Sequence, residues 1–403
     1  MLRKLFRRAP RIHVIDPSCL HPLGHHVAVN QLIAKWGAKF GFETQVFVNR
    51  WCDAKVRTLF DSIPVLRYFP IREAPEDIDA LRNSLAQFND DTLNRLLPYS
   101  RDIREGDRVV MHTAHPWAIG GLHSWLAQSG MPKVNISIIF RFAPDYNIKP
   151  AARLVITKYF GDVLAQLRSL DPNVGLFADT PGLAEICEKQ FGAPFFVIPI
   201  SVDIAAADKS APLDMDGPVR FVFAGEARTE KGIDFVPKAA EGLAAHDRHA
   251  RIILQTCSGA SETSRRRLEL APNIEILGQS LHGKSYQDFL LSGTYILTQY
   301  DPDQYTLRTS HIFVEALSLG RPVVTSKGSW MEDELARLAP GAGICVDYSA
   351  EGLLSGLVAG LEQSGVHLTA ARGHMDQVRS RHSAERFFRA VVLHEQSESF
   401  PDE

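Results

Sequence analysis

Short apolar runs alternate along the chain with stretches in which apolar residues recur every three to four positions. In the first half, runs of strand length are 11–16, 44–48, 107–112, 133–140, 174–179 and 195–199. Helical spacing separates them, as in Val27, Leu32, Ile33, Trp36 and Phe40. Strands that alternate with helices predict a parallel sheet covered by helices.

The second half repeats this alternation after a segment of different composition. Residues 203–218 are mostly small and acidic and include Pro and Gly, which is typical of a linker. Further strand-like runs are 219–225, 251–256, 274–277, 295–299, 323–325 and 341–346. We therefore predict an N-terminal domain over 1–202, a linker over 203–218 and a second domain over 219–380. Residues 350–361 and 369–379 should form two helices of the second domain. Residues 381–403 should hold a terminal helix, with its apolar face over 385–394.

Length and composition agree with two ordinary globular domains. The chain has 403 residues, of which 45% are hydrophobic and 23% charged. A net charge of -3 argues against general nucleic-acid binding. No apolar run approaches the roughly 20 residues that span a bilayer, and no secretory signal is evident. The five scattered cysteines fit a reducing compartment, so we predict a cytoplasmic protein.

Residues 1–11 carry five basic side chains and no acidic one, interleaved with Leu2, Leu5 and Phe6. One interpretation is weak peripheral contact with an anionic membrane surface, such as the inner membrane. The other is a solvated chain end, because a single short basic segment binds membranes weakly.

Several polar residues of the first half follow directly after predicted strands. They are Gly24 and His25 after the first strand, His115 after 107–112 and Arg141 after 133–140. In open α/β sheets ligands bind at the carboxyl ends of the strands, so these residues are candidates for a cleft. The His25-His26 pair suggests a metal, but no third ligand is evident and we predict none.

The second half holds two loops that suit a phosphate group. After the strand 219–225, the segment from Gly225 to Gly232 carries Arg228 and Lys231 and leads into a helix. The polar loop 301–310 opens another helix, one turn into which lies Glu315. A helix N-terminus with nearby cations attracts anions.

The motif FVEALSLGRPVV (313–324) resembles the EAxxxGxPVV signature of the group 1, or sucrose-synthase-like, retaining glycosyltransferases. The loop at 225–232 is similar to the GRxxxEKG loop of that family, with Glu230, Lys231 and Gly232 in register and the arginine two positions later, at Arg228. The segments VIPISVD and GAGICV also resemble family segments.

The resemblance implies an α/β protein of two Rossmann-like domains facing across a cleft, the GT-B fold. It implies transfer of a sugar, with retention of configuration, from a nucleotide-diphosphate sugar to a glycan, lipid-linked or other hydroxyl acceptor. Polysaccharide biosynthesis is the pathway class that this family suggests. The terminal helix would pack back on the first domain.

Site roles follow from the same resemblance. His115, Arg228 and Lys231 are the predicted catalytic residues. Donor-binding residues would be Gly225, Tyr305, Arg308, Thr309, Ser310 and Glu315, with Glu315 on the ribose. Gly24, His25 and Arg141 would face the acceptor. From the sequence alone, Arg141 could instead pair with phosphate or with Asp145. No metal or other cofactor is implied, since cationic side chains and helix termini supply the positive charge. The segment Asp301-Pro302-Asp303 does match the DxD pattern of a metal-binding motif.

One position departs from the family pattern. The family carries a second Glu eight residues before Glu315, where this chain has Leu307. Two alternatives therefore stay open, namely a nucleotide-sugar epimerase of the same fold and a non-catalytic nucleotide- or sugar-binding protein.

Overall fold

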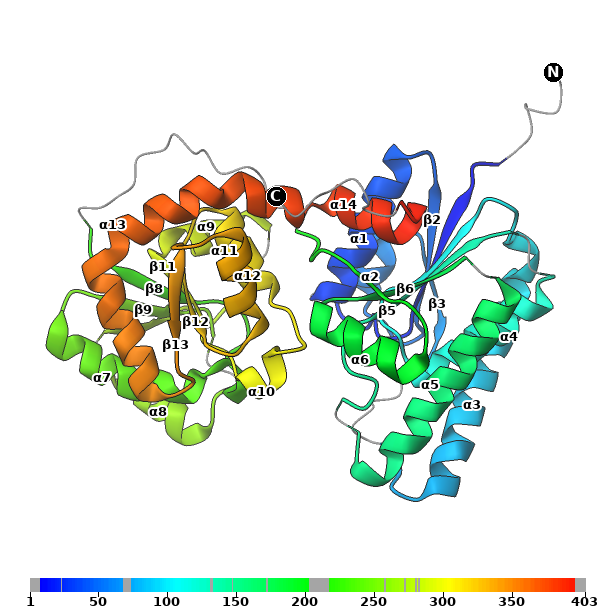
Figure 1. Cartoon of the computed structure of the whole chain (residues 1–403), viewed down its shortest axis with the longest axis horizontal. Coiled ribbons are helices and arrows are strands. Elements are labelled where there is room, and N and C mark those ends of the chain that lie inside the picture. The colour runs from blue at the N-terminus through cyan, green and yellow to red at the C-terminus, as the bar shows by residue number, and fades with distance from the viewer. Residues whose placement is uncertain are drawn as a thin grey trace. The chain divides into compact units, whose positions relative to one another are not determined.

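The computed structural model describes residues 8–395 except 23, 68–73, 131–132, 147, 172, 203–216, 257–258, 272, 280 and 282. The chain divides into two compact units (Figure 1). Unit 1 comprises Met1–Ser201 together with Ala384–Glu403, and unit 2 comprises Val202–Ser383. Each unit is an α/β structure built on its own parallel sheet, which confirms the predicted fold class at this level.

In unit 1 the described strands form a seven-stranded sheet in the order β3-β2-β1-β4-β5-β6-β7. Their bounds are β1 Arg11–Asp16, β2 Glu43–Asn49, β3 Ser62–Leu66, β4 Arg108–Met111, β5 Asn135–Phe140, β6 Val174–Ala178 and β7 Phe196–Val197. All neighbouring pairs are parallel. The sequence predicted every one of these strands except β3, whose Pro64 and Ser62 weaken the apolar pattern.

Helices cover both faces of this sheet. They are α1 His25–Lys39, α2 Ala54–Leu59, α3 Ile78–Leu96, α4 Pro116–Gln128, α5 Pro150–Leu170 and α6 Pro181–Phe191, with a 3-10 turn at Leu97–Asp102. One core cluster joins α3 to α6 with residues such as Phe47 and Met111, and the other joins α1 and α2 with Ile12 and Val110. Alternate strand residues therefore face two separate hydrophobic layers.

The C-terminal segment belongs to the second of these layers. It consists of α14 (Ala384–Phe388) and a π-helical turn (Arg389–Leu393). Phe387, Phe388, Val391 and Val392 are fully buried against the sheet. The sequence predicted one helix over 385–394, whereas the wider turn lets both apolar pairs face the core before His394 ends it with a φ of 55°.

In unit 2 the described strands form a six-stranded parallel sheet in the order β10-β9-β8-β11-β12-β13. The strands are β8 Arg220–Phe223, β9 Arg251–Leu254, β10 Ile274–Ile276, β11 Tyr295–Thr298, β12 Val323–Ser326 and β13 Gly343–Val346. The helices are α7 Val236–His246, α8 Glu262–Leu270, α9 Gly283–Ser292, α10 Pro302–Tyr305, α11 His311–Ser318, α12 Trp330–Leu338 and α13 Ala350–Arg381, with 3-10 turns at Thr229–Lys231 and Ile233–Phe235.

Helix α13 runs through a region that the sequence predicted as two helices, 350–361 and 369–379. It is one element with a kink at Gln363, whose φ and ψ (-122° and 16°) leave the helical range. The intervening polar and Gly residues suggested a loop, but His367 and Leu368 are buried there. Nδ1 of His367 lies 2.8 Å from the Tyr295 hydroxyl, so tertiary packing continues the helix.

Both sheets reverse their strand order at one place, between β1 and β4 in unit 1 and between β8 and β11 in unit 2. Open α/β sheets bind ligands at this switch point, outside the carboxyl ends of the strands. The fold thus singles out the loops after these four strands.

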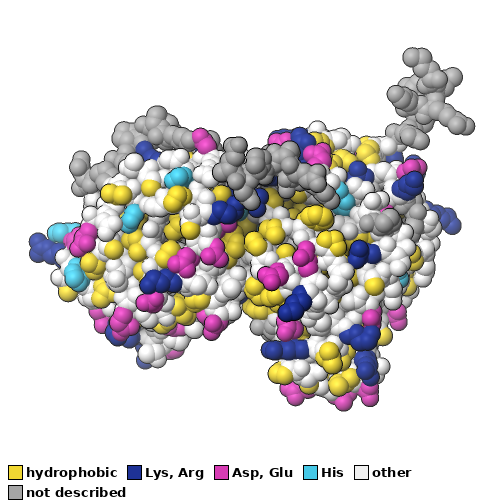
Figure 2. Space-filling view, in the orientation of Figure 1, with side chains coloured by type: hydrophobic (Ala, Val, Ile, Leu, Met, Phe, Trp, Pro, Cys, Tyr) yellow, Lys and Arg dark blue, Asp and Glu magenta, His cyan; other side chains and the backbone are white. Residues whose placement is uncertain are grey.

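Charged side chains of both signs are mixed on the face of each unit that Figure 2 displays, where Lys and Arg are interspersed with Asp and Glu. In the part of the chain that the structure describes, no helix combines the length and the apolar character needed to cross a membrane.

Candidate functional site

The loop after β8 begins with a glycine that no other residue could replace without strain. Gly225 has a φ of 77°, and a Cβ placed on it would lie 3.0 Å from Cδ1 of Ile312 in α11. Its N–H donates to Oε1 of the buried Gln255 at 2.7 Å. The loop after β8 is therefore held directly against the start of α11.

Lys231 lies in the 3-10 turn of this loop, and its side chain is nearly buried, with 9% exposed. Its Nζ lies 3.5 Å from the position of a Cβ on Gly225 and 5.4 Å from the ring centroid of Tyr300. Burial, together with a smaller effect of the neighbouring Arg228, lowers the pKa of Lys231 to about 8. Burial disfavours the charged form of the ammonium group, so an anionic ligand beside it would stabilise that form strongly.

The side chain of Arg228 is more exposed to solvent than that of Lys231. Its Nη1 pairs with Glu230 at 3.1 Å, its Nε lies 4.0 Å from Glu226, and 39% of its side chain is exposed. The predicted clamp on a diphosphate would require the guanidinium to exchange these carboxylates for phosphate oxygens.

The loop after β11 lies beside the loop after β8. The N–H of Asp301 donates to the carbonyl of Glu230 at 2.9 Å, which ties the two loops together. Arg308 stacks over Tyr305, with Cζ 4.5 Å from the ring centroid, and Nη1 donates to Gln304 at 3.3 Å. The charge of Arg308 also contributes to lowering the pKa of Lys231. Three cations thus face the same region.

The motif Asp301-Pro302-Asp303 has a structural role. The Asp301 carboxylate accepts hydrogen bonds from the N–H of Asp303 at 3.0 Å and from Nε2 of Gln304 at 3.1 Å, which caps α10. Both carboxylate oxygens of Asp301 therefore already accept hydrogen bonds from this chain.

Glu315 lies in α11, whose first turn is capped by the Ser310 hydroxyl accepting from the N–H of Phe313 at 3.2 Å. Oε2 of Glu315 accepts the Tyr286 hydroxyl at 2.8 Å, which leaves Oε1 for another donor. Burial raises the pKa of Glu315, and the hydrogen bond from Tyr286 opposes that rise. The half-buried Thr309 directly precedes the cap.

Tyr300 is the centre of this region, and the sequence analysis did not assign it a role. It is fully buried, its ring lies 4.7 Å from that of Tyr305, and burial raises its pKa. Smaller electrostatic effects on Tyr300 come from Tyr305, Ser310, Arg228 and Glu315. The predicted donor residues of unit 2 therefore gather around one buried tyrosine at the end of β11.

In unit 1 the loop after β1 begins α1. Gly24 has a φ of 91° at the N-cap of that helix, and the rings of His25 and His26 lie 4.0 Å apart. His26 and the buried His112, which follows β4, lie on either side of the Asp16 carboxylate. Burial alone would raise the pKa of Asp16, but the two histidines hold it well below its usual range.

These three residues are the only described His, Cys, Asp and Glu side chains grouped closely enough to hold a metal ion. The sequence analysis noticed the His25-His26 pair but not Asp16 or His112. Asp16 is a carboxylate at the carboxyl end of β1, directly after Val14 and Ile15, and that position was the available signal.

Arg141 and His115 lie near the same end of the sheet. Arg141 donates to the His112 carbonyl at 3.0 Å and forms a buried ion pair with Asp179 at 2.6 Å. From the sequence, the partner of Arg141 could have been phosphate, the acceptor or Asp145. His115 is buried at the N-cap of α4.

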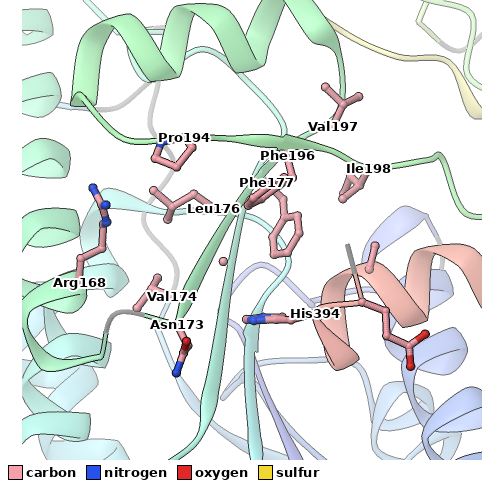
Figure 3. Close-up of a pocket in the computed structure, with 13 residues that line it drawn as sticks. Arg168, Asn173, Val174, Leu176, Phe177, Pro194, Phe196, Val197, Ile198 and His394 are labelled. Carbon is pink, nitrogen blue, oxygen red and sulfur yellow. The ribbon is translucent and has the colours of Figure 1, made fainter. Parts of the chain in front are cut away.

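Unit 1 also contains a pocket of about 390 Å³ that coincides with none of the predicted residues (Figure 3). It lies beside β6 and β7, is lined by Phe177, Phe196 and Ile198, and receives His394 from the C-terminal segment. Burial lowers the pKa of His394 to about 4, so this histidine is neutral at pH 7.

The described cysteines form no disulfide bonds.

Comparisons with known proteins agree on the fold. No protein-family model matches the sequence, and no curated protein matches it. Among solved structures, HepE from Anabaena in complex with UDP has a TM-score of 0.65 at 14% identity, covering 97% of this chain and 100% of that one. Sucrose-phosphate synthase from Thermosynechococcus elongatus has a TM-score of 0.61 at 16% identity, covering 94% of this chain and 96% of that one.

A protein described as a putative UDP-N-acetylglucosamine 2-epimerase, from Listeria monocytogenes, is also similar. Its TM-score is 0.57 at 13% identity, with 98% of this chain and 99% of that one covered. At these identities the likeness establishes a shared architecture of two parallel-sheet domains, the one seen in GT-B glycosyltransferases.

Proposed function

We propose that this protein is a retaining glycosyltransferase that binds a nucleotide-diphosphate sugar in unit 2 and transfers the sugar to a hydroxyl acceptor. One observation carries the proposal. Lys231, buried and with a pKa lowered to about 8, lies beside Gly225 and Tyr300 at the switch point of the sheet. A buried cation with Arg228 and Arg308 close by suits a diphosphate.

The chemistry follows from the charge that develops on the leaving diphosphate. Breaking the anomeric bond passes through an oxocarbenium-like state and leaves negative charge on phosphate oxygens. Fixed donors at that position lower the barrier, and removing one commonly costs about 3 kcal/mol. Lys231, Arg228 and the N–H groups of Thr309 and Ser310 are the proposed donors, without a metal ion on the diphosphate.

Glu315 is the proposed ribose ligand. Its Oε2 accepts from Tyr286, so Oε1 is the oxygen that a ribose hydroxyl would reach. Tyr286 would hold the carboxylate in one orientation, which reduces the entropy lost on binding. His115 and Arg141, with Gly24 and His25, remain the proposed acceptor-side residues in unit 1.

Calorimetric titration with UDP, GDP, ADP and CMP, with and without Mg²⁺, is the first test. We expect one diphosphate to bind, with UDP the first choice because HepE shares the fold and was solved with UDP. Binding should be the same with and without Mg²⁺, since protein cations supply the charge. No binding of any nucleotide would contradict the proposal.

Variants of the donor residues test the assignment of the site. Arg308→Ala and Glu315→Gln should each weaken nucleotide binding by roughly 10-fold or more, because each removes a charge-assisted contact. Arg266→Ala and Glu351→Gln are matched controls at exposed surface positions and should leave nucleotide binding unchanged. Unaltered turnover in both site variants would show that the site lies elsewhere.

A nucleotide-sugar epimerase is the second candidate, because the similar Listeria protein is described as such an enzyme. An epimerase would convert the nucleotide sugar, or release nucleotide, without any acceptor. A transferase releases nucleotide in proportion to added acceptor. Product analysis with and without acceptor therefore separates the two. Binding without either reaction would favour the non-catalytic alternative that Leu307 suggests.

A further inference from the structure

The switch point of unit 1 holds a cluster that the proposed transfer reaction does not use. Its residues come from three elements, namely Asp16 at the end of β1, His26 in the first turn of α1 and His112 just after β4. Because β1 and β4 are adjacent parallel strands, their carboxyl ends bring Asp16 and His112 together. Helix α1 returns over the same edge and adds His26.

The distances between donor atoms are close to those of a metal site. Nδ1 of His26 lies 2.9 Å from Oδ1 of Asp16, and Nε2 of His112 lies 3.0 Å from Oδ2. Ligands of a tetrahedral zinc ion, at bond lengths of about 2.0–2.1 Å, stand roughly 3.3 Å apart. A small outward movement of the two rings would therefore admit an ion.

The third ligand lies within reach of the other two. The ligand atoms of Asp16, His26 and His112 all lie within 4.8 Å of one another. The ring centroids of His26 and His112 are 5.4 Å apart, with the ring planes inclined at 48°. A single ion could therefore contact all three residues.

Neighbouring residues would orient the ligands. Nδ2 of Asn30 donates to Oδ2 of Asp16 at 2.8 Å, which fixes the carboxylate. Nε2 of His112 lies 3.1 Å from Oδ1 of Asn30, and Nδ1 lies 3.4 Å from the Thr113 hydroxyl. Metal binding requires the Nε2 lone pair, so the ring proton would move to Nδ1, where Thr113 accepts it.

We propose that Asp16, His26 and His112 bind one divalent transition-metal ion of the zinc type at the switch point of unit 1. Two imidazole nitrogens and one carboxylate oxygen favour Zn²⁺ over Mg²⁺ or Ca²⁺, which prefer oxygen ligands. Three protein ligands leave a fourth position, which catalytic zinc sites keep for water or a ligand oxygen. The inference does not depend on the proposed transfer reaction.

Zinc titration of the full-length protein, after dialysis against a chelator, tests the inference. We expect one equivalent of Zn²⁺ to bind in competition with a chromophoric chelator, and Mg²⁺ not to displace it. Loss of an outer-shell partner already weakens metal binding roughly 10- to 100-fold. His26→Ala, which removes a ligand, should therefore weaken Zn²⁺ binding by at least about 100-fold.

His21→Ala is the matched control, because His21 is an exposed histidine of the loop that precedes α1. It should bind Zn²⁺ like the unmodified protein. His26 is partly exposed, so its replacement should leave the circular dichroism spectrum unchanged, whereas Asp16→Asn provides a second variant at the buried ligand. Failure to bind one equivalent, or unchanged binding in folded His26→Ala, would overturn the inference whether or not nucleotides bind to unit 2.

Discussion

Replacing Lys231 by Met is expected to weaken binding of the nucleoside diphosphate about 10- to 100-fold and to stabilise the ligand-free protein. The first effect follows from the loss of a charge-assisted contact of about 1.5–3 kcal/mol. The second follows from the burial of Lys231, which lowers its pKa from 10.5 to about 8.

The sign of the stability effect follows from proton linkage. Between pH 8 and 10.5 the unfolded chain holds a proton on Lys231 that the folded chain has released, so stability rises with pH in that window. Below pH 8 the folded protein carries the buried charge at a cost of up to about 3 kcal/mol. The Met variant avoids that cost, and an anionic ligand compensates for it in the unmodified protein.

Calorimetry with the diphosphate and denaturant unfolding at pH 7 and pH 9.5 measure both effects. The stabilising effect of Lys231→Met should be larger at pH 7 than at pH 9.5. Lys238→Met is the matched control, because Lys238 is 61% exposed and pairs with the exposed Glu351. It should change neither quantity. Destabilisation by Lys231→Met, or undiminished affinity, would contradict the role assigned to this residue.

Replacing Arg141 by Met is expected to destabilise unit 1 by about 3–5 kcal/mol. The substitution leaves Asp179 buried without its partner, and removal of one member of a buried ion pair has this magnitude. Burial already raises the pKa of Asp179 despite the nearby guanidinium. The variant also loses the hydrogen bond to the His112 carbonyl.

The double variant Arg141→Met/Asp179→Leu separates a structural role from a role toward the acceptor. Removing both charges should restore stability to within about 1 kcal/mol, because no unpaired charge remains. If Arg141 also contacts the acceptor, the restored protein should bind nucleotide normally but transfer sugar poorly. Arg153→Met, at an exposed arginine 3.9 Å from Asp145, should change stability by less than about 0.5 kcal/mol. A small effect of the single variant would contradict the pairing.

Much of the fold was predictable because apolar spacing reports local structure directly. Runs such as RIHVID and KVNISIIF form β1 and β5, and their alternate residues face two helical layers. The sequence failed where local pattern and tertiary packing disagree. Residues 362–368 looked like a loop and became part of α13, because His367 and Leu368 gain burial by remaining helical.

Motif spacing nominated the donor-side residues, whose role stays a prediction, but it did not indicate how they lie relative to one another. Gly225 and Lys231 were nominated from the loop after β8 and Glu315 from α11, whereas Tyr300, which lies near Lys231, looked like an ordinary aromatic residue at the end of a strand. The pairing of Arg141 with Asp179 joins residues 38 positions apart and has no local signal.

By itself, the sequence determined that this protein has two parallel α/β sheets and two polar loops in the second half suited to an anion. These are local properties, set by spacing along a helix or strand and by residues such as glycine that permit unusual turns. Only the tertiary structure decided which polar groups meet at each switch point. Asp16, His26 and His112 converge because parallel strands align their carboxyl ends, and the pKa of Lys231 is lowered because its side chain is buried beside Gly225 and Tyr300.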